Sequence, residues 1–281
     1  MLIVDAQVHT WAASTPERPW SGGGEPQRAV PFTNADLLRE MDAAGVHRAV
    51  LVPPGWEGSR NDLALAAARA YPHRFAVMGR IAPQVLSKSK GVLIGWRKQP
   101  GMLGLRLAMN IPKAPQILGS GKLDWLWQEA EAEGVPLMIL MRPEHVHLVD
   151  AIAAKHPQLK IVMDHFALDG HKRDAEAFRD FDQLLAIARR PNVAAKASAL
   201  PCYTNDTYPF RALHPYLHQA YDAFGPQRLF WGTDLSRSPI PYRQQVTMFT
   251  EEIPWLTAKD KAWIMGRGVC EWLGWPITDA R

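Results

Sequence analysis

Several features are scarce or absent in this sequence of 281 residues, and each absence excludes a class of protein. The only two cysteines, Cys202 and Cys270, are far apart and lack the spacing of a disulfide framework or a metal site. No stretch approaches the ~20 apolar residues of a membrane-spanning helix. The first residues also lack the basic and apolar pattern of a signal peptide. We therefore expect a cytoplasmic protein without a membrane partner.

Blocks of like charge are missing as well. The formal net charge is +4, and the basic residues are scattered rather than clustered on one segment. Nucleic-acid binding normally leaves a basic patch or stripe, so no nucleic-acid partner is expected. A basic pocket for a small anionic substrate remains compatible with this charge. The sequence leaves the formation of a homo-oligomer open.

What the sequence does contain is an eightfold alternation of short apolar runs with helical patterns. This pattern is typical of βα units that build a parallel sheet. The runs are LIVDAQV, RAVLVPP, RFAVMGRIA, GMLGLRLA, PLMILM, KIVMDHF, NVAAKAS and RLFWGTD. Most are continuously apolar, as expected for strands that are covered on both faces. With a length near the roughly 250 residues of such a fold, the chain is predicted to be an α/β protein, a single (β/α)8 TIM barrel over residues 1–281.

Helices are expected between these runs, for example over 31–45, where Thr33 or Asn34 is the N-cap and Gly45 the stop. The last helical pattern, 262–275, is expected to pack across the outside or the bottom of the barrel. Two irregular stretches, 12–32 and 199–209, follow the first and seventh strands. Active-site loops lie at these places in a barrel.

Polar residues occupy the ends of the predicted strands. In a barrel these ends converge on one face, which carries the active site. The two-residue period of a strand places Asp5, Gln7 and His9 on the same, inward side. The other candidates near strand ends are Trp11, Trp56, Arg106, Arg142, His165, Lys196, Asp234 and Arg237.

Each of these residues taken alone also has a structural explanation. Asp234 could cap the next helix, His165 could be a core histidine, and Arg106 could belong to a buried ion pair. Their joint appearance at strand ends is what favours a functional site, because continuously apolar strands otherwise exclude charge.

The motifs at the strand ends resemble those of the amidohydrolase superfamily. VDAQVHTW is similar to its first-strand D-x-H-x-H motif, IVMDHF to its sixth-strand histidine, and LFWGTDLSR to its eighth-strand aspartate. Blocks such as GMLGLRL and RRPNVAAKAS are similar to the amidohydrolase-2 branch, which contains lactonases and metal-dependent decarboxylases. The resemblance covers nearly the whole chain and implies a hydrolase.

Two positions depart from the pattern of the metal-binding members. Gln7 stands where that pattern has its first histidine, and Met141 stands where they carry a histidine or a carboxylated lysine. Zinc favours imidazole, thiolate or carboxylate ligands over an amide. No metal and no other cofactor are therefore expected, as in the metal-independent lactonases of this branch.

The sequence thus predicts a hydrolase that opens a small anionic lactone of sugar-acid or aromatic-acid catabolism. Asp234 would activate water, with a basicity raised by partial desolvation, and His9 and His165 would donate hydrogen bonds to the carbonyl oxygen. The residues assigned to substrate binding are Gln7, Trp11, Trp56, Arg106, Arg142, Lys196 and Arg237.

Two alternatives remain open. One is a metal-dependent hydrolase or decarboxylase that uses His9, His165 and Asp234 as ligands, since three ligands and water suffice for catalytic zinc. The other is a non-catalytic barrel that binds a small acid. The identity and stereochemistry of the substrate, and the choice between hydrolysis and lactone isomerisation, are not decided by the sequence.

Overall fold

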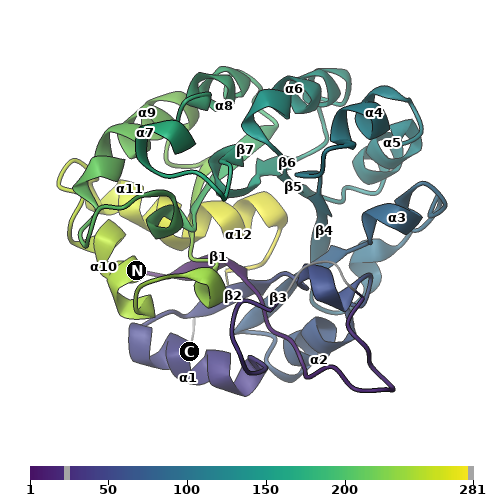
Figure 1. The fold of residues 1–281 in the computed structure, drawn as a ribbon, viewed down its shortest axis with the longest axis horizontal. Helices are drawn as coiled ribbons and strands as arrows, with labels where there is room; N and C mark the ends of the chain where they lie inside the picture. The colour runs from purple at the N-terminus through teal and green to yellow at the C-terminus, as the bar shows by residue number, and fades with distance from the viewer. Residues whose placement is uncertain (22–25, 278–281) are drawn as a thin grey trace.

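Eight parallel strands, each paired with the next in chain order, form the centre of the molecule (Figure 1). The computed structural model describes residues 1–21 and 26–277. The strands are β1 (Val4–Val8), β2 (Arg48–Leu51), β3 (Phe75–Arg80), β4 (Met102–Ala108), β5 (Leu137–Leu140), β6 (Ile161–Met163), β7 (Val193–Ser198) and β8 (Leu229–Gly232). Each lies within one of the eight apolar runs, so the predicted α/β barrel is confirmed.

The barrel closes between β8 and β1 through a side chain as well as the backbone. The amide of Asp234 donates to the carbonyl of Gln7 at 2.9 Å, and the amide of Thr233 donates to Asp5 Oδ1 at 2.9 Å. Asp5 also accepts from the amide of Gln7 and from the hydroxyls of Thr233 and Tyr242. Burial nonetheless raises the pKa of this carboxyl to about 6.

This arrangement corrects the prediction that Asp5 points inward with Gln7 and His9. The pairing of β1 with β2 shifts register between Asp5 and Val8, as it does at a β-bulge. Val4 and Ala6 belong to the apolar cluster inside the barrel, whereas Asp5 bonds to Tyr242 of an outer helix. The irregularity breaks the two-residue period. Asp5 instead has a structural role at the junction of β8 and β1, which we call the barrel seam.

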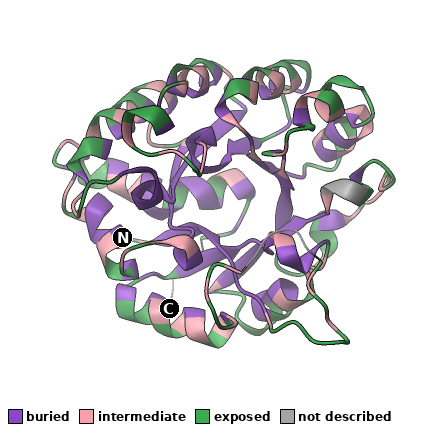
Figure 2. Cartoon of the chain, in the orientation of Figure 1, coloured by how far each residue is buried: buried purple, intermediate pink, exposed green. Residues whose placement is uncertain are grey.

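Helices surround the strands, with their exposed residues on the outside of the molecule and their buried residues toward the strands (Figure 2). They are α1 (Asn34–Ala44), α2 (Asp62–Ala70), α3 (Pro83–Leu86), α4 (Ala114–Gly119), α5 (Asp124–Ala132), α6 (Val146–Lys155), α7 (Asp174–Ala177), α8 (Phe181–Ile187), α9 (His214–Phe224), α10 (Tyr242–Thr250), α11 (Ala258–Ala262) and α12 (Gly268–Leu273). Thr33 caps α1 in a capping box with Asp36, and Gly45 ends it at φ 78°, as the sequence predicts.

The barrel interior is filled by apolar side chains at the end opposite the strands' carboxyl ends. Val4, Ala6, Met78, Met138 and Phe230 pack there with residues of α12, and in Figure 1 this helix lies across the centre of the barrel. The prediction that the last helical segment packs against the outside or the bottom is therefore confirmed for the bottom. Side chains occupy the interior, so functional groups can meet only at the other end.

The long loops after β1 and β7 border that other end. The loop after β1 is held at Arg18, which bonds to Glu57 and Asp62, and at Gln27, whose side chain bonds to Ser236 beyond β8. The predicted irregular stretch 12–32 contains this loop, although residues 22–25 lie outside the described part. Among the described residues, no helix combines the length and apolar character needed to cross a bilayer.

Candidate active site

A cavity of about 570 Å³ opens at the carboxyl ends of the strands, the face on which the sequence places the site. Residues from almost every strand end and from both long loops surround it. Its polar lining comprises His9, Gln27, Arg80, Arg106, Asn110, Arg142, His165, Asp169, His171, Tyr203, Asp234 and Arg237. The predicted residues His9, Trp56, Arg106, Arg142, His165, Asp234 and Arg237 all take part in this lining.

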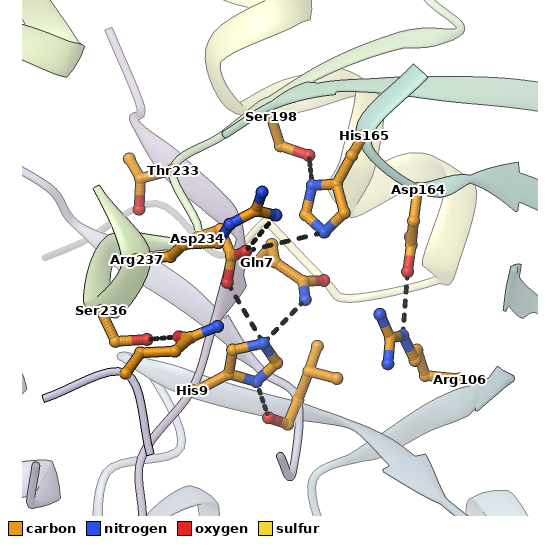
Figure 3. A network of polar contacts seen from close by, with 12 residues as sticks. Gln7, His9, Arg106, Asp164, His165, Ser198, Thr233, Asp234, Ser236 and Arg237 are labelled. Carbon is orange, nitrogen blue, oxygen red and sulfur yellow. Dashed lines mark hydrogen bonds and ion pairs between the residues drawn. The ribbon is translucent and has the colours of Figure 1, made fainter. Parts of the chain in front are cut away.

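Asp234 lies between the two histidines at the buried end of the cavity (Figure 3). Its Oδ1 is 3.2 Å from His9 Nε2, and its Oδ2 is 3.8 Å from His165 Nε2. Arg237 Nη1 is 4.0 Å from the same Oδ2. A carboxylate flanked in this way can accept a proton from a water or hydroxyl in the cavity and has a second base beside it.

The backbone at both strand ends is held in the left-handed region. His165 has φ 50° and Asp234 has φ 52°, although neither is a glycine. A non-glycine residue in such a conformation costs roughly 1–3 kcal/mol and persists only where the surrounding structure holds it. At Asp234 the hydrogen bond from its amide to the Gln7 carbonyl helps to hold this conformation, and the turn directs the carboxylate toward His9.

Gln7 and Lys196 do not line the cavity but lie beneath it, in contact with each other. Lys196 is fully buried, and its Nζ donates to Gln7 Oε1 at 2.6 Å. An ammonium group can only donate, so it requires the oxygen of the Gln7 amide to face it. The Gln7 Nε2 then faces His9 Nε2 at 3.3 Å. The structure therefore gives the predicted substrate contacts of these two residues no support.

This contact places the proton of His9. Its Nδ1 lies 2.6 Å from the carbonyl of Val52, which can only accept. A neutral His9 with its proton on Nδ1 satisfies Val52 and also accepts from Gln7 at Nε2. That nitrogen also faces Asp234, so a second proton taken up there would be donated to the carboxylate 3.2 Å away. His9 can therefore exchange a proton with Asp234 at Nε2, and its expected hydrogen bond to a carbonyl oxygen stays a prediction.

Arg106 contacts a buried carboxylate that the predicted site did not include. Its Nε donates to Asp164 Oδ2 at 3.0 Å, and Lys196 Nζ lies 2.7 Å from Asp164 Oδ1. The charges of Lys196 and Arg106 outweigh the effect of burial and lower the pKa of Asp164 to about 2. Arg106 therefore belongs to the buried ion pair considered as its structural alternative, and it also lines the cavity.

The protonation of Asp234 and His165 differs from the expectation. Burial alone would raise the pKa of Asp234, but contact with His9 and the neighbouring positive charges hold it well below its ordinary value. The predicted gain in basicity is therefore wrong for the free protein. Burial lowers the pKa of His165 to about 4 even though Asp234 opposes the shift, so His165 is neutral at pH 7.

The remaining predicted residues lie nearer the rim or behind it. Trp11 is buried behind the cavity and packs edge-on against Trp56 at 5.2 Å, so Trp56 is the tryptophan that contacts the cavity. Arg142 is half-exposed, 3.8 Å from Glu144. Arg237 lies over the ring of Tyr203 at 5.5 Å.

Six polar lining residues were not predicted from the sequence: Gln27, Arg80, Asn110, Asp169, His171 and Tyr203. Arg80 carried a usable signal, since it is a charged residue near the end of the third apolar run, followed there only by Ile81 and Ala82. The other five lie in the loops and short turns that follow the strands, where no periodicity predicts the direction of a side chain.

The side chains that the structure describes do not form a metal site. Within residues 1–21 and 26–277, no group of three or more His, Cys, Asp and Glu side chains is arranged to hold an ion. His9 Nε2 is next to the Gln7 amide, which is a poor zinc ligand. The ammonium of Lys196 lies on the other side of that amide and adds a positive charge.

A model of the amidohydrolase family matches residues 4–267. The chain therefore belongs to the amidohydrolase family, which confirms the resemblance drawn from the strand motifs. It is 24% identical over 242 residues to the L-fucono-1,5-lactonase of Burkholderia ambifaria, covering 82% of this chain and 79% of that protein. It is 26% identical over 241 residues to the 4-sulfomuconolactone hydrolase of Hydrogenophaga intermedia, covering 83% and 74%.

Solved structures show the same fold. An amidohydrolase from Burkholderia multivorans, crystallised with bound zinc, superimposes with a TM-score of 0.80 at 21% identity, covering 98% of this chain and 100% of that one. At this identity the likeness extends to the barrel alone. Membership of a family of hydrolases agrees with the hydrolase class predicted from the strand ends.

Proposed function

We propose that this protein hydrolyses a small anionic lactone, with Asp234 as the group that activates water. The observation that carries the proposal is the position of the Asp234 carboxylate, between His9 and His165 at the buried end of a cavity lined by four arginines. Similarity to two lactone-opening enzymes supports the ester bond as the target.

The first step is removal of a proton from water. A water within hydrogen-bond reach of Asp234 gives its proton to the carboxylate as its oxygen attacks the lactone carbonyl carbon. The depressed pKa makes Asp234 a weak base on its own, so the proton passes on to His9 Nε2, 3.2 Å away. The resulting imidazolium and carboxylate form an ion pair, which makes the proton transfer more favourable.

The second step is stabilisation of the oxyanion and opening of the ring. His165 Nδ1 lies 2.7 Å from Ser198 Oγ, and when that hydroxyl donates to it, neutral His165 carries its proton on Nε2. This N–H then donates to the developing oxyanion. The ring C–O bond breaks, the alkoxide takes back the proton from His9, and the product is a hydroxy acid. An alkoxide leaves more easily than an amine, which favours lactones over amides.

We propose that this chemistry runs without a metal, since Gln7 replaces a ligand and the histidines and Asp234 act directly. The metal-dependent hydrolase or decarboxylase is the alternative to be tested alongside it.

The test is a substrate panel with a metal measurement on the same sample. The panel contains L-fucono-1,5-lactone, 4-sulfomuconolactone and 2-pyrone-4,6-dicarboxylate, and acid release is followed with a pH indicator. Saturable turnover of at least one carboxylated or sulfonated lactone is expected, with far less than one metal per chain. Saturable binding of these compounds without turnover would instead favour the non-catalytic barrel.

A further inference from the structure

Arg80 is an arginine at the end of β3 that points into the barrel end where the cavity lies. Ala76 and Met78, four and two residues earlier, pack inside the barrel, and the strand period places Arg80 on the same side. Only 7% of Arg80 is exposed, and that part contacts the cavity. Asn61 holds its backbone on both sides, accepting from the amide at 2.7 Å and donating to the carbonyl at 3.1 Å.

The charge of Arg80 has no counter-ion among the described residues. Its guanidinium takes part in no ion pair there, and its buried Nε has no hydrogen-bond partner. The buried carboxylate that pairs with the neighbouring Arg106, that of Asp164, is already shared with Lys196. Burial and the charge of Arg106 lower the pKa of Arg80 to about 10, so it remains charged at neutral pH.

Arg106 lies directly beside Arg80, because the two residues are register partners in the β3–β4 pair. Arg106 uses its Nε for Asp164, and no hydrogen bond within the described residues occupies its two terminal nitrogens. Two adjacent guanidinium groups, those of Arg80 and Arg106, thus border the cavity. The one carboxylate that pairs with Arg106, that of Asp164, is shared with Lys196. Buried charges are normally paired, so this excess of positive charge is costly unless an anion binds.

We propose that Arg80 and Arg106 together bind a carboxylate of the substrate, on the β3–β4 side of the cavity. Guanidinium groups match the planar geometry of a carboxylate and hold it through parallel N–H donors. The reacting carbonyl lies toward Asp234 at the end of β8, so the substrate is a lactone whose ring carries a carboxylate remote from the ester. This assignment of substrate class rests on the proposed lactonase function, but the anion site does not.

The test measures binding of glutarate, a non-hydrolysable dicarboxylate, and of its neutral analogue glutaramide by calorimetry. Wild-type protein is expected to bind glutarate and not glutaramide. Arg80→Met should raise the Kd for glutarate at least about tenfold, the effect of losing one charge-assisted hydrogen bond. Arg80→Lys keeps the charge but not the planar guanidinium group, so its Kd for glutarate should lie between those of the wild type and Arg80→Met. Arg69→Met, on the exposed face of α2, is the control for loss of one charge.

Thermal unfolding without ligand separates binding from structure. Arg80→Met removes a buried charge that has no partner in the described part of the chain, so its Tm should equal or exceed that of the wild type. Arg106→Met takes a partner from buried Asp164, so its Tm should fall. A Tm that falls for Arg80→Met, with glutarate binding unchanged in the folded protein, would show that Arg80 is structural and overturn the proposal. Absence of glutarate binding to the wild type at millimolar concentration would also overturn it.

The two proposals fail in different ways. If glutarate binding depends on Arg80 but no lactone is turned over, the anion site stands and the hydrolase does not. If lactones are hydrolysed and Arg80→Met changes neither glutarate binding nor KM, the hydrolase stands and the Arg80 subsite does not.

Discussion

Replacement of Asp234 by asparagine removes the proposed acceptor of the water proton with little change of shape. The side chain is buried, and its Oδ1 has His9 Nε2 as a neighbour at 3.2 Å. An amide in that place can accept from a protonated His9 Nε2 through its oxygen or donate to an unprotonated one through its N–H. We therefore expect the variant to fold, with a free energy of unfolding within about 1–2 kcal/mol of the wild type.

The expected effect on catalysis follows from the loss of a general base. Such a base contributes about 10²–10⁴ in rate, which equals roughly 3–5 kcal/mol of activation free energy. His9 cannot replace Asp234 without moving, because Val52 and Gln7 hold its ring on two sides. The loss should therefore appear in kcat rather than in KM, since Asp234 acts on water and not on the substrate's anion.

The assay is steady-state hydrolysis of the best lactone from the panel, by wild type, Asp234→Asn and Asp182→Asn. Asp182 is an exposed residue of α8 and controls for the loss of a negative charge. Denaturant unfolding of each protein verifies the folded fraction. A correctly folded Asp234→Asn protein with near-wild-type kcat would refute the mechanism.

Three further predictions follow from other parts of the structure. Activity should survive exhaustive treatment with a chelator, and loss of activity that zinc restores would establish the metal-dependent alternative. The pKa of His165 is lowered from 6.5 to about 4 in the folded protein. Between pH 4 and 6.5 the unfolded chain therefore binds more protons than the folded chain. The free energy of unfolding is thus fully retained above pH 6.5 and decreases as the pH falls toward 4. His165→Gln should remove about 3 kcal/mol of that pH dependence in urea unfolding, and an unchanged slope would contradict it. Asp5→Ala leaves the Thr233 and Tyr242 donors of the barrel seam without an acceptor and should destabilise the fold by more than about 3 kcal/mol; a smaller loss on chemical denaturation would show that the seam does not depend on Asp5.

Much of the candidate site was predictable because a barrel brings all its strand ends to one face. Once the eight apolar runs are recognised, any charged residue at the end of a run is expected near the cavity, and His9, Arg106, His165 and Asp234 all line it. Arg80 obeys the same rule, but two apolar residues, Ile81 and Ala82, follow it in its run, so the sequence alone does not show that the strand ends at Arg80.

Other properties depended on contacts between residues far apart in the chain. The irregularity in β1 turned Asp5 outward into the seam, because a single extra residue reverses the side of a strand on which a side chain lies. Lys196 follows the strand-end rule but lies beneath the cavity, where Asp164 and Gln7 hold its ammonium group.

The sequence by itself determined the barrel, its family and the set of groups that meet at one end, because these follow from periodicity and from residue types at strand ends. Tertiary structure decided the protonation and pairing of those groups. The pKa of Asp234 is lowered rather than raised, since His9 and its other neighbours outweigh burial. Within residues 1–21 and 26–277, Arg80 is left without a partner, and Asp164 is shared by Arg106 and Lys196. Desolvation and charge pairing act over a few ångströms between separate strands, so they depend on distances that only the folded chain defines.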